Sequence, residues 1–266
     1  MISYTIDENY EVKLNEANGK HEVLKNGKKI EEKPPVLFKY VPFNNNVVAS
    51  LMQGYFWLTN PADFNDPFDC NKTVIVDYEH PEHLKDKARN YFEDIGICSF
   101  SDMQNNPLMW AHYTNNYNGI MLEFSFDNFE GFLFTERFKS LEWKKVIYPN
   151  RIIGLHKSYP LSETILLTSK IKNWEYENEW RIIAKLDNPE NRYLPFPREA
   201  LKNIYIGHNL YDNNSSEVHI ISTIQQTYYP HAKIFRVIPD QTRNLAYRVQ
   251  RVMDFSKINN PDSAHL

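Results

Sequence analysis

The sequence contains little glycine and little cysteine. Only 8 of its 266 residues are Gly, and the phosphate-binding patterns GxxxxGK(S/T) and GxGxxG are both absent. P-loop and Rossmann nucleotide chemistry is therefore not expected. The two cysteines, Cys70 and Cys98, belong to no CxxC pair or Cys/His cluster, which argues against a zinc site and a disulfide scaffold. We expect two reduced, buried thiols.

Long apolar runs and a targeting segment are also missing. No run approaches the roughly 20 residues that span a bilayer, and the N-terminus MISYTIDENYEVK lacks a basic-then-apolar signal pattern. We therefore expect a cytoplasmic protein without a membrane partner. The formal net charge of -4 creates no strong overall field for nucleic acid or acidic lipid, although a local basic groove is compatible with it.

Aromatic residues are abundant, with 17 Tyr and 16 Phe, while the charged fraction of 24% is ordinary for a globular protein. The length suits one large domain with a small appendage. We predict an N-terminal β-hairpin-like appendage and linker over residues 1–35, a main domain over 36–256 and a flexible tail over 257–266. In the appendage, Tyr10, Val12 and Leu14 alternate with polar residues, and Asn18-Gly19 supplies a turn before a second strand.

Strands and helices are intermixed in the main domain without strict alternation, which favours an α+β fold with mixed or antiparallel sheets and flanking helices. Caps and apolar spacing predict helices over residues 45–53, 81–95, 107–113, 162–174 and 215–229. Alternating or apolar runs predict strands over residues 36–41, 55–60, 97–101, 119–126, 142–149, 179–186, 203–208, 233–239 and 244–252.

The segment FNDPFD, residues 64–69, is rich in turn formers. Asn and Asp bond their own backbone readily, so a rigid turn is the plainer interpretation. The functional interpretation is a loop that directs Asn65 and Asp66 into a cleft. Asp66 and Asp69 could also bind a metal ion, but no His lies nearby in the sequence, so we expect none.

The segment MWAHYTNNYNG, residues 109–119, is predicted to begin as a helix. Met109, His112 and Tyr113 would share one face and Trp110 would point elsewhere. His112 is then either a structural histidine or, with Tyr113, a hydrogen-bond donor in an aromatic pocket wall.

The segment WEYENEWR, residues 174–181, is predicted to become a strand near residue 176. Glu177, Glu179 and Arg181 would lie on one face. They form either a solvated Glu-Arg face or a positioned carboxylate, Glu179, in a cleft walled by Trp.

Together, and in this order, these segments resemble a bacterial family catalogued as domain of unknown function 2971. The family pattern is an LYKY strand, NPxxFNDPFE, SFS, MWAHYxxxHxGxxLEF and KxxxWxxExEWR, and the resemblance covers roughly residues 36 to 240. The chain matches it with LFKY from Leu37, NPADFNDPFD from Asn60, and the runs 99–101, 109–124 and 170–181. It departs at Asp69, where the family has Glu, and at Tyr117, where the family has His.

The order of these segments is similar to that of ADP-ribosyltransferases, and this likeness implies a split sheet and NAD as substrate. It implies a first-strand anchor at Lys39 or Tyr40, a second-strand element within residues 57–65, and Glu179 as the catalytic glutamate. The expected catalytic residues are Glu179, Glu177 and His112. The expected nucleotide-binding residues are Lys39, Tyr40, Asn65, Asp66, Trp110, Tyr113, Trp174 and Arg181.

Three functions follow as expectations. The first is an NAD-consuming ADP-ribosyltransferase or NAD glycohydrolase, acting as a bacterial toxin or phage-defence effector on a protein or nucleic-acid acceptor. The second is a non-catalytic module that binds a nucleotide or a partner. The third is a metal-dependent hydrolase or nuclease that uses Asp66, Asp69 and Glu177 or Glu179.

Overall fold

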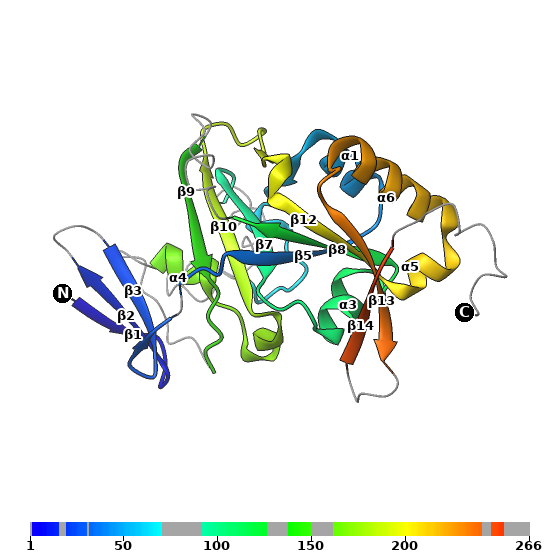
Figure 1. Ribbon diagram of the computed structural model, residues 1–266. Coiled ribbons are helices and arrows are strands. Elements are labelled where there is room, and N and C mark those ends of the chain that lie inside the picture. Colours follow the sequence, from blue (N-terminus) through cyan, green and yellow to red (C-terminus); the bar gives the residue numbers. More distant parts are fainter. Residues whose placement is uncertain are drawn as a thin grey trace. The chain divides into compact units, whose positions relative to one another are not determined.

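The computed structural model describes residues 2–15, 20–30, 32–70, 92–126, 138–150, 162–240 and 246–252. Most of the described strands join one mixed sheet, which confirms the predicted α+β class (Figure 1). These strands are β5 (Val36–Pro42), β7 (Ile95–Ser101), β8 (Gly119–Ser125), β9 (Phe138–Lys145), β10 (Glu179–Leu186), β12 (Leu201–Ile206), β13 (Lys233–Asp240) and β14 (Ala246–Arg251). Their order is β14-β13-β12-β8-β5-β7-β10-β9.

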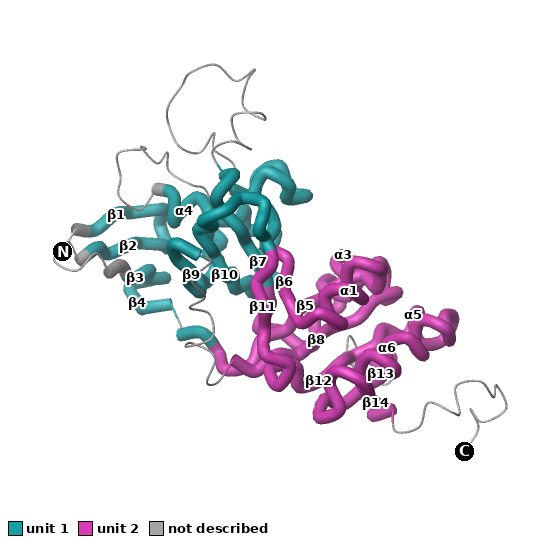
Figure 2. Tube along the Cα trace, turned by 90° about the horizontal axis from the view of Figure 1, so that it is seen from above, with its two compact units in different colours: residues 1–33, 58–99, 135–192 teal, residues 34–57, 100–134, 193–266 magenta. Residues whose placement is uncertain are grey.

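The chain divides into two compact units, which Figure 2 colours separately. Unit 1 comprises residues 1–33, 58–99 and 135–192, and unit 2 comprises residues 34–57, 100–134 and 193–266. Residues 1–33, which include most of the predicted appendage, belong to unit 1 together with two later segments. The predicted tail over 257–266 lies outside the described residues.

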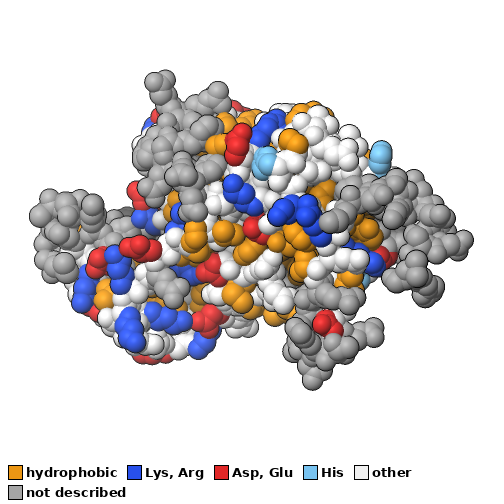
Figure 3. Space-filling model, in the orientation of Figure 1, with side chains coloured by type: hydrophobic (Ala, Val, Ile, Leu, Met, Phe, Trp, Pro, Cys, Tyr) orange, Lys and Arg blue, Asp and Glu red, His pale blue; other side chains and the backbone are white. Residues whose placement is uncertain are grey.

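The N-terminal part of unit 1 is a four-stranded sheet in the order β1-β2-β3-β4. Its strands are β1 (Ile2–Thr5), β2 (Tyr10–Asn15), β3 (Lys20–Lys25) and β4 (Lys28–Lys29). The antiparallel pairing of β2 with β3 confirms the predicted hairpin, whose Asn18-Gly19 turn lies outside the described residues. Acidic and basic side chains are interspersed over this sheet, at the left of Figure 3.

The predicted helix over 162–174 is shorter in the structure. It ends as α4 (Ser162–Thr168), and the 3₁₀ helix η4 (Lys172–Glu177) follows. The chain leaves the helix because Ser169 forms a parallel bridge with Ile147. The helix predicted over 81–95 lies largely outside the described part of the chain, and no described helix is long and apolar enough to cross a membrane.

In unit 2, the central strand β8 pairs with β5 on one side and with β12 on the other, both antiparallel. Met121 pairs with Tyr40 and Tyr205, whereas Phe124 pairs with Leu37 and so faces the opposite side of the sheet. The Tyr40 ring meets Trp110 of α3 (Pro107–Tyr113) edge to face. Phe124 contacts the aromatic core formed by Phe56, Phe100, Phe126 and Phe196.

Local capping signals place two helices of unit 2. Helix α1 (Asn45–Gln53) begins where Asn44 accepts a hydrogen bond from the Val47 N–H and ends at Gly54, whose φ is 75°. Helix α6 (Ser215–Tyr228) follows its N-cap Asn214 and buries Val218, Ile221 and Ile224. The strand predicted over 55–60 is shorter in the structure, as β6 (Tyr55–Trp57). The sequence suggested neither its partner β11 (Tyr193–Pro195) nor the short helix α5 (His208–Asn213).

The connection between α3 and β8 is unusually constrained. Asn115, Asn116 and Tyr117 all adopt positive φ angles, which non-glycine residues rarely do. Gly119, the first residue of β8, is packed so closely that an added Cβ would lie 2.4 Å from the Val41 carbonyl oxygen. Because that oxygen belongs to the backbone of β5, it cannot move aside without disturbing the sheet.

We therefore predict that Gly119→Ala destabilises the protein by about 3 kcal/mol through overpacking. The matched control is Gly27→Ala, since Gly27 has a φ of 75° and open space around it. This control should cost only about 1 kcal/mol, from the positive φ alone. Urea unfolding midpoints of both variants measure the difference, and equal midpoints would contradict the close packing of Gly119.

Candidate functional site

Two of the three segments singled out in the sequence meet inside unit 1. Residues 64–70 and 174–181 join the end of α4 around a cluster of five buried charged side chains. We call this the ionic cluster, and its members are Asp69, Lys170, Glu177, Glu179 and Arg181. The third segment, residues 109–119, belongs to unit 2.

The guanidinium of Arg181 is the most deeply buried member, with no exposed side-chain surface. Its Nε and Nη2 donate to the two oxygens of Glu179 at 2.8 and 3.1 Å. Nη2 also donates to Asp69 Oδ2 at 2.6 Å, and Nη1 donates to the Leu167 carbonyl at 2.7 Å. The planar guanidinium of arginine can donate hydrogen bonds from more than one edge at the same time, which suits this arrangement of acceptors.

Lys170 supplies the second cation of the ionic cluster. Its Nζ lies 2.7 Å from Glu177 Oε2 and 3.5 Å from one oxygen each of Asp69 and Glu179. The same ammonium lies 4.9 Å from the centre of the Trp174 ring. One ammonium thus lies within 3.5 Å of three carboxylates.

The chain brings Glu177 and Glu179 into one cluster by changing conformation between them. The strand predicted over 179–186 is confirmed as β10, whereas the extended start near residue 176 is wrong, because η4 continues to Glu177. Asn178 joins the two with a φ of 45°, a conformation that Asn tolerates better than most residues. Arg181 follows two residues into β10 and therefore faces the same side as Glu179.

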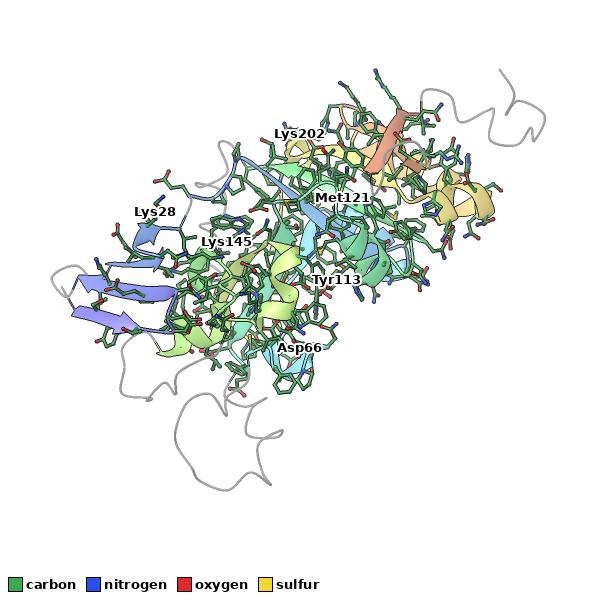
Figure 4. The ribbon with its side chains drawn as sticks, turned by 90° about the horizontal axis from the view of Figure 1, so that it is seen from below. Lys28, Asp66, Tyr113, Met121, Lys145 and Lys202 are labelled. Carbon is green, nitrogen blue, oxygen red and sulfur yellow. The ribbon has the colours of Figure 1, made fainter. Side chains whose placement is uncertain are left out.

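The FNDPFD segment forms the rigid turn expected of it. Asp66 Oδ1 accepts a hydrogen bond from the Phe68 N–H, and the Asp69 N–H donates to the Asp66 carbonyl. The turn delivers Asp69 to the ionic cluster, while Asn65 is exposed. Asp66, labelled in Figure 4, is buried, and its Oδ2 has no hydrogen-bond partner among the residues that the structure describes.

The charges of the ionic cluster control its ionisation. Burial alone would raise the pKa of Glu179, but the charges of Arg181 and Lys170 outweigh it and lower this pKa from 4.5 to about 2. Burial would likewise lower the pKa of Lys170, yet the neighbouring carboxylates, led by Glu179, raise it. Burial raises the pKa of the Cys70 thiol well above its usual value, so this thiol remains protonated.

The residues predicted in unit 2 have mostly structural contacts. Trp110 is buried and stacks on Tyr117, with 6.1 Å between the ring centroids. The Tyr40 hydroxyl donates toward the Met103 and Gln104 carbonyls, and Lys39 lies over the Phe100 ring at 5.1 Å. The remaining two lie at the end of α3, where His112 is exposed and Tyr113, labelled in Figure 4, is partly buried.

Sequence reasoning missed Lys170 and Tyr148 and considered Asp69 only as a metal ligand. A signal for Lys170 was present, because it opens the run KxxxWxxExEWR that also contains Trp174 and both glutamates. Tyr148 carried no such signal. Its hydroxyl accepts a hydrogen bond from the Glu179 N–H at 2.8 Å, a contact across 31 residues.

Comparison with known proteins gives one finding. Residues 109–182 match the model of a family described as protein of unknown function, DUF2971. The match begins in α3 of unit 2 and ends in β10, one residue beyond Arg181. No curated protein and no solved structure matches the chain.

Replacing Lys170 by Met should destabilise the protein by about 3–5 kcal/mol, because it leaves buried carboxylates without their shared cation. The matched control is Lys185→Met, whose ammonium is 46% exposed and lies 3.8 Å from Asp94. Such a surface pair contributes less than about 1 kcal/mol. Chemical unfolding of both variants tests the contrast, and a small loss in Lys170→Met would show that the ionic cluster is not integral to stability.

The pH dependence of the free energy of unfolding should show the contribution of the Glu179 carboxylate. Its folded pKa is depressed, so its contribution is present above pH 4.5 and is lost as the pH falls toward about 2. That interval corresponds to on the order of 3 kcal/mol. In Glu179→Gln this part of the acid-induced loss should disappear, whereas the exposed control Glu190→Gln should retain it. Parallel stability–pH curves for all three proteins would exclude the assignment.

Proposed function

We propose that this protein consumes NAD, as an ADP-ribosyltransferase or an NAD glycohydrolase, with Glu179 as the anion beside the reacting ribose. In this reaction the bond between ribose C1′ and the nicotinamide nitrogen breaks, and its electron pair leaves with neutral nicotinamide. The resulting oxocarbenium-like cation is captured by water or by an acceptor nucleophile, which then loses a proton. The role we expect for such an activity is that of a bacterial toxin or phage-defence effector.

The observation that carries the proposal is a carboxylate that stays ionised inside unit 1. With a pKa of about 2, Glu179 is an anion at every physiological pH. A fixed anion in a dry interior stabilises a developing cation more than a solvated one does. Since Arg181 engages both oxygens, the role of Glu179 would be electrostatic rather than that of a general base.

Two further features of unit 1 fit a nucleotide ligand. Within the described parts of the chain Asp66 Oδ2 is a buried acceptor without a donor, and a ribose hydroxyl or a carboxamide N–H would supply one. The Trp174 ring is only partly buried and carries the Lys170 ammonium on its face, which suits an aromatic wall for the nicotinamide.

The depth of burial favours a second function, that of a non-catalytic module that binds a nucleotide or a partner. Glu179 is 4% exposed and Glu177 is 2% exposed, so both are covered in this conformation. Catalysis requires the ionic cluster to open toward the ribose, whereas a binding module can use the cluster as a closed scaffold.

The metal-dependent alternative receives no support from the donor set. In the described parts of the chain, no group of three or more His, Cys, Asp or Glu side chains is arranged to hold a metal ion. The Lys170 ammonium and the Arg181 guanidinium are already paired with the three carboxylates of the ionic cluster.

Nicotinamide release from NAD by the full-length protein is the direct test. We expect turnover that Glu179→Gln lowers by at least about 100-fold, since a single preorganised electrostatic group contributes about 10²–10³ in kcat. The exposed control Glu190→Gln should remain fully active. Without turnover in water or with protein and nucleic-acid acceptors, the enzymatic proposal fails.

Binding separates the two candidate functions. For an enzyme, Glu179→Gln should still bind NAD, seen as a rise in melting temperature with NAD concentration. For a binding module, the wild-type protein should show that rise without releasing nicotinamide. If NAD changes neither turnover nor melting temperature, both nucleotide proposals are wrong.

A further inference from the structure

The segment that follows β9, residues 146–150, connects the ionic cluster to the N-terminal sheet within unit 1. It forms hydrogen bonds with both the carbonyl and the N–H of Glu179. The Val146 N–H donates to the Glu179 carbonyl at 3.0 Å, and the Glu179 N–H donates to the Tyr148 hydroxyl at 2.8 Å. The position at which β10 begins is therefore set by this segment.

The same segment also fixes the backbone of Lys170. The Ile147 N–H donates to the Thr168 carbonyl at 2.8 Å, and the Ile147 carbonyl accepts from the Lys170 N–H at 3.0 Å. One stretch of three residues thus holds the backbone of both Glu179, the proposed anion, and Lys170, the cation beside it.

The N-terminal sheet in turn holds residues 146–150. The Tyr10 hydroxyl accepts a hydrogen bond from the Tyr148 N–H at 3.4 Å. Asp7 Oδ2 accepts from the Asn150 N–H at 2.8 Å, while Asp7 Oδ1 accepts from the Tyr10 N–H at 2.8 Å. Asp7, Tyr10 and Tyr148 are all buried, where an unmade hydrogen bond is costly.

Apolar packing also connects the N-terminal sheet to residues 146–150. Ile147 shares one hydrophobic core with side chains of the N-terminal sheet and with α4. The other buried members of this core are Ile6, Tyr10, Val12, Leu14 and Ile165. A displacement of the sheet would therefore disturb residues 146–150 through packing as well as through hydrogen bonds.

We propose that Tyr148 is a positioning residue that connects the N-terminal sheet to Glu179 and Lys170. On this view the sheet is part of the candidate site and not an appendage to it. The chemical importance of the positioned groups rests on the proposed function, but the connection itself does not. The hydroxyl of Tyr148 acts through the backbone of Glu179 and need not touch a ligand.

Native-state hydrogen exchange of the full-length protein tests the connection. In Tyr148→Phe the Glu179 N–H loses its acceptor, and we expect exchange in residues 176–182 to accelerate about tenfold, the size of one hydrogen bond. Tyr10→Phe lies in β2, yet it should accelerate exchange in the same residues and in 168–171. The control Tyr193→Phe removes a hydroxyl from a side chain that is 43% exposed in unit 2 and should change neither region.

Peptides from β8 and β12 separate positioning from general destabilisation. Acceleration confined to residues 146–150 and 168–182 supports the proposal, whereas equal acceleration in 119–125 and 201–206 overturns it. Unchanged exchange in 176–182 overturns it too. If Tyr148→Phe does not fold, the exchange pattern of Tyr10→Phe decides the question by itself.

The outcome is independent of the proposed enzyme activity. If the expected exchange pattern is observed but no nicotinamide is released, the connection is supported and the NAD chemistry is rejected. Where turnover is measured, both tyrosine variants should lower kcat with little change in KM, because they displace the anion without removing a ligand contact. A change in KM alone would assign Tyr148 to ligand binding and overturn its positioning role.

Discussion

Burying the guanidinium of Arg181 is the constraint on which the interior of unit 1 depends. A charged group removed from water loses hydration worth several kcal/mol, and it is tolerated only when partners replace that hydration. Those partners come from distant parts of the chain: Asp69 from a turn, Leu167 from the end of α4 and Glu179 from the start of β10. The turn, the helix end and the strand start must therefore occupy fixed positions together.

This constraint explains why the ionic cluster supports two opposite functional interpretations. The pairs that keep Glu179 ionised also cover it, because the cations lowering its pKa are the groups in contact with it. An anion that is held so firmly is well suited to electrostatic stabilisation and poorly suited to proton transfer. The chemistry of the site thus depends on whether a ligand gains access to the carboxylate that Arg181 now holds.

Features governed by neighbouring residues were predictable from the sequence. The limits of α1 follow from Asn44 and Gly54, and the hairpin of β2 and β3 follows from alternating apolar residues. The α+β class followed from the mixture of such local patterns. The turn at FNDPFD was also predicted, because Asp66 bonds the backbone two residues ahead.

Features governed by contacts between distant residues were not predictable in the same way. Glu177, Glu179 and Arg181 were identified by their pattern, but their partners Asp69 and Lys170 depend on how the turn and α4 pack. The 3₁₀ turn before the strand was not predicted, because the positive φ of Asn178 follows from the fit of η4 to β10. The burial of Trp110 was not predicted either, since it depends on Tyr40 and Tyr117.

The division of the chain into two units, each composed of three separated segments, has an evolutionary consequence. Unit 1 contains residues 1–33, 58–99 and 135–192, and every gap between them is filled by unit 2. No single cut or exchange of sequence can transfer one unit without breaking the other. A single recombination crossover between relatives would therefore leave at least one unit composed of residues from two parents, even though the chain folds into two compact parts.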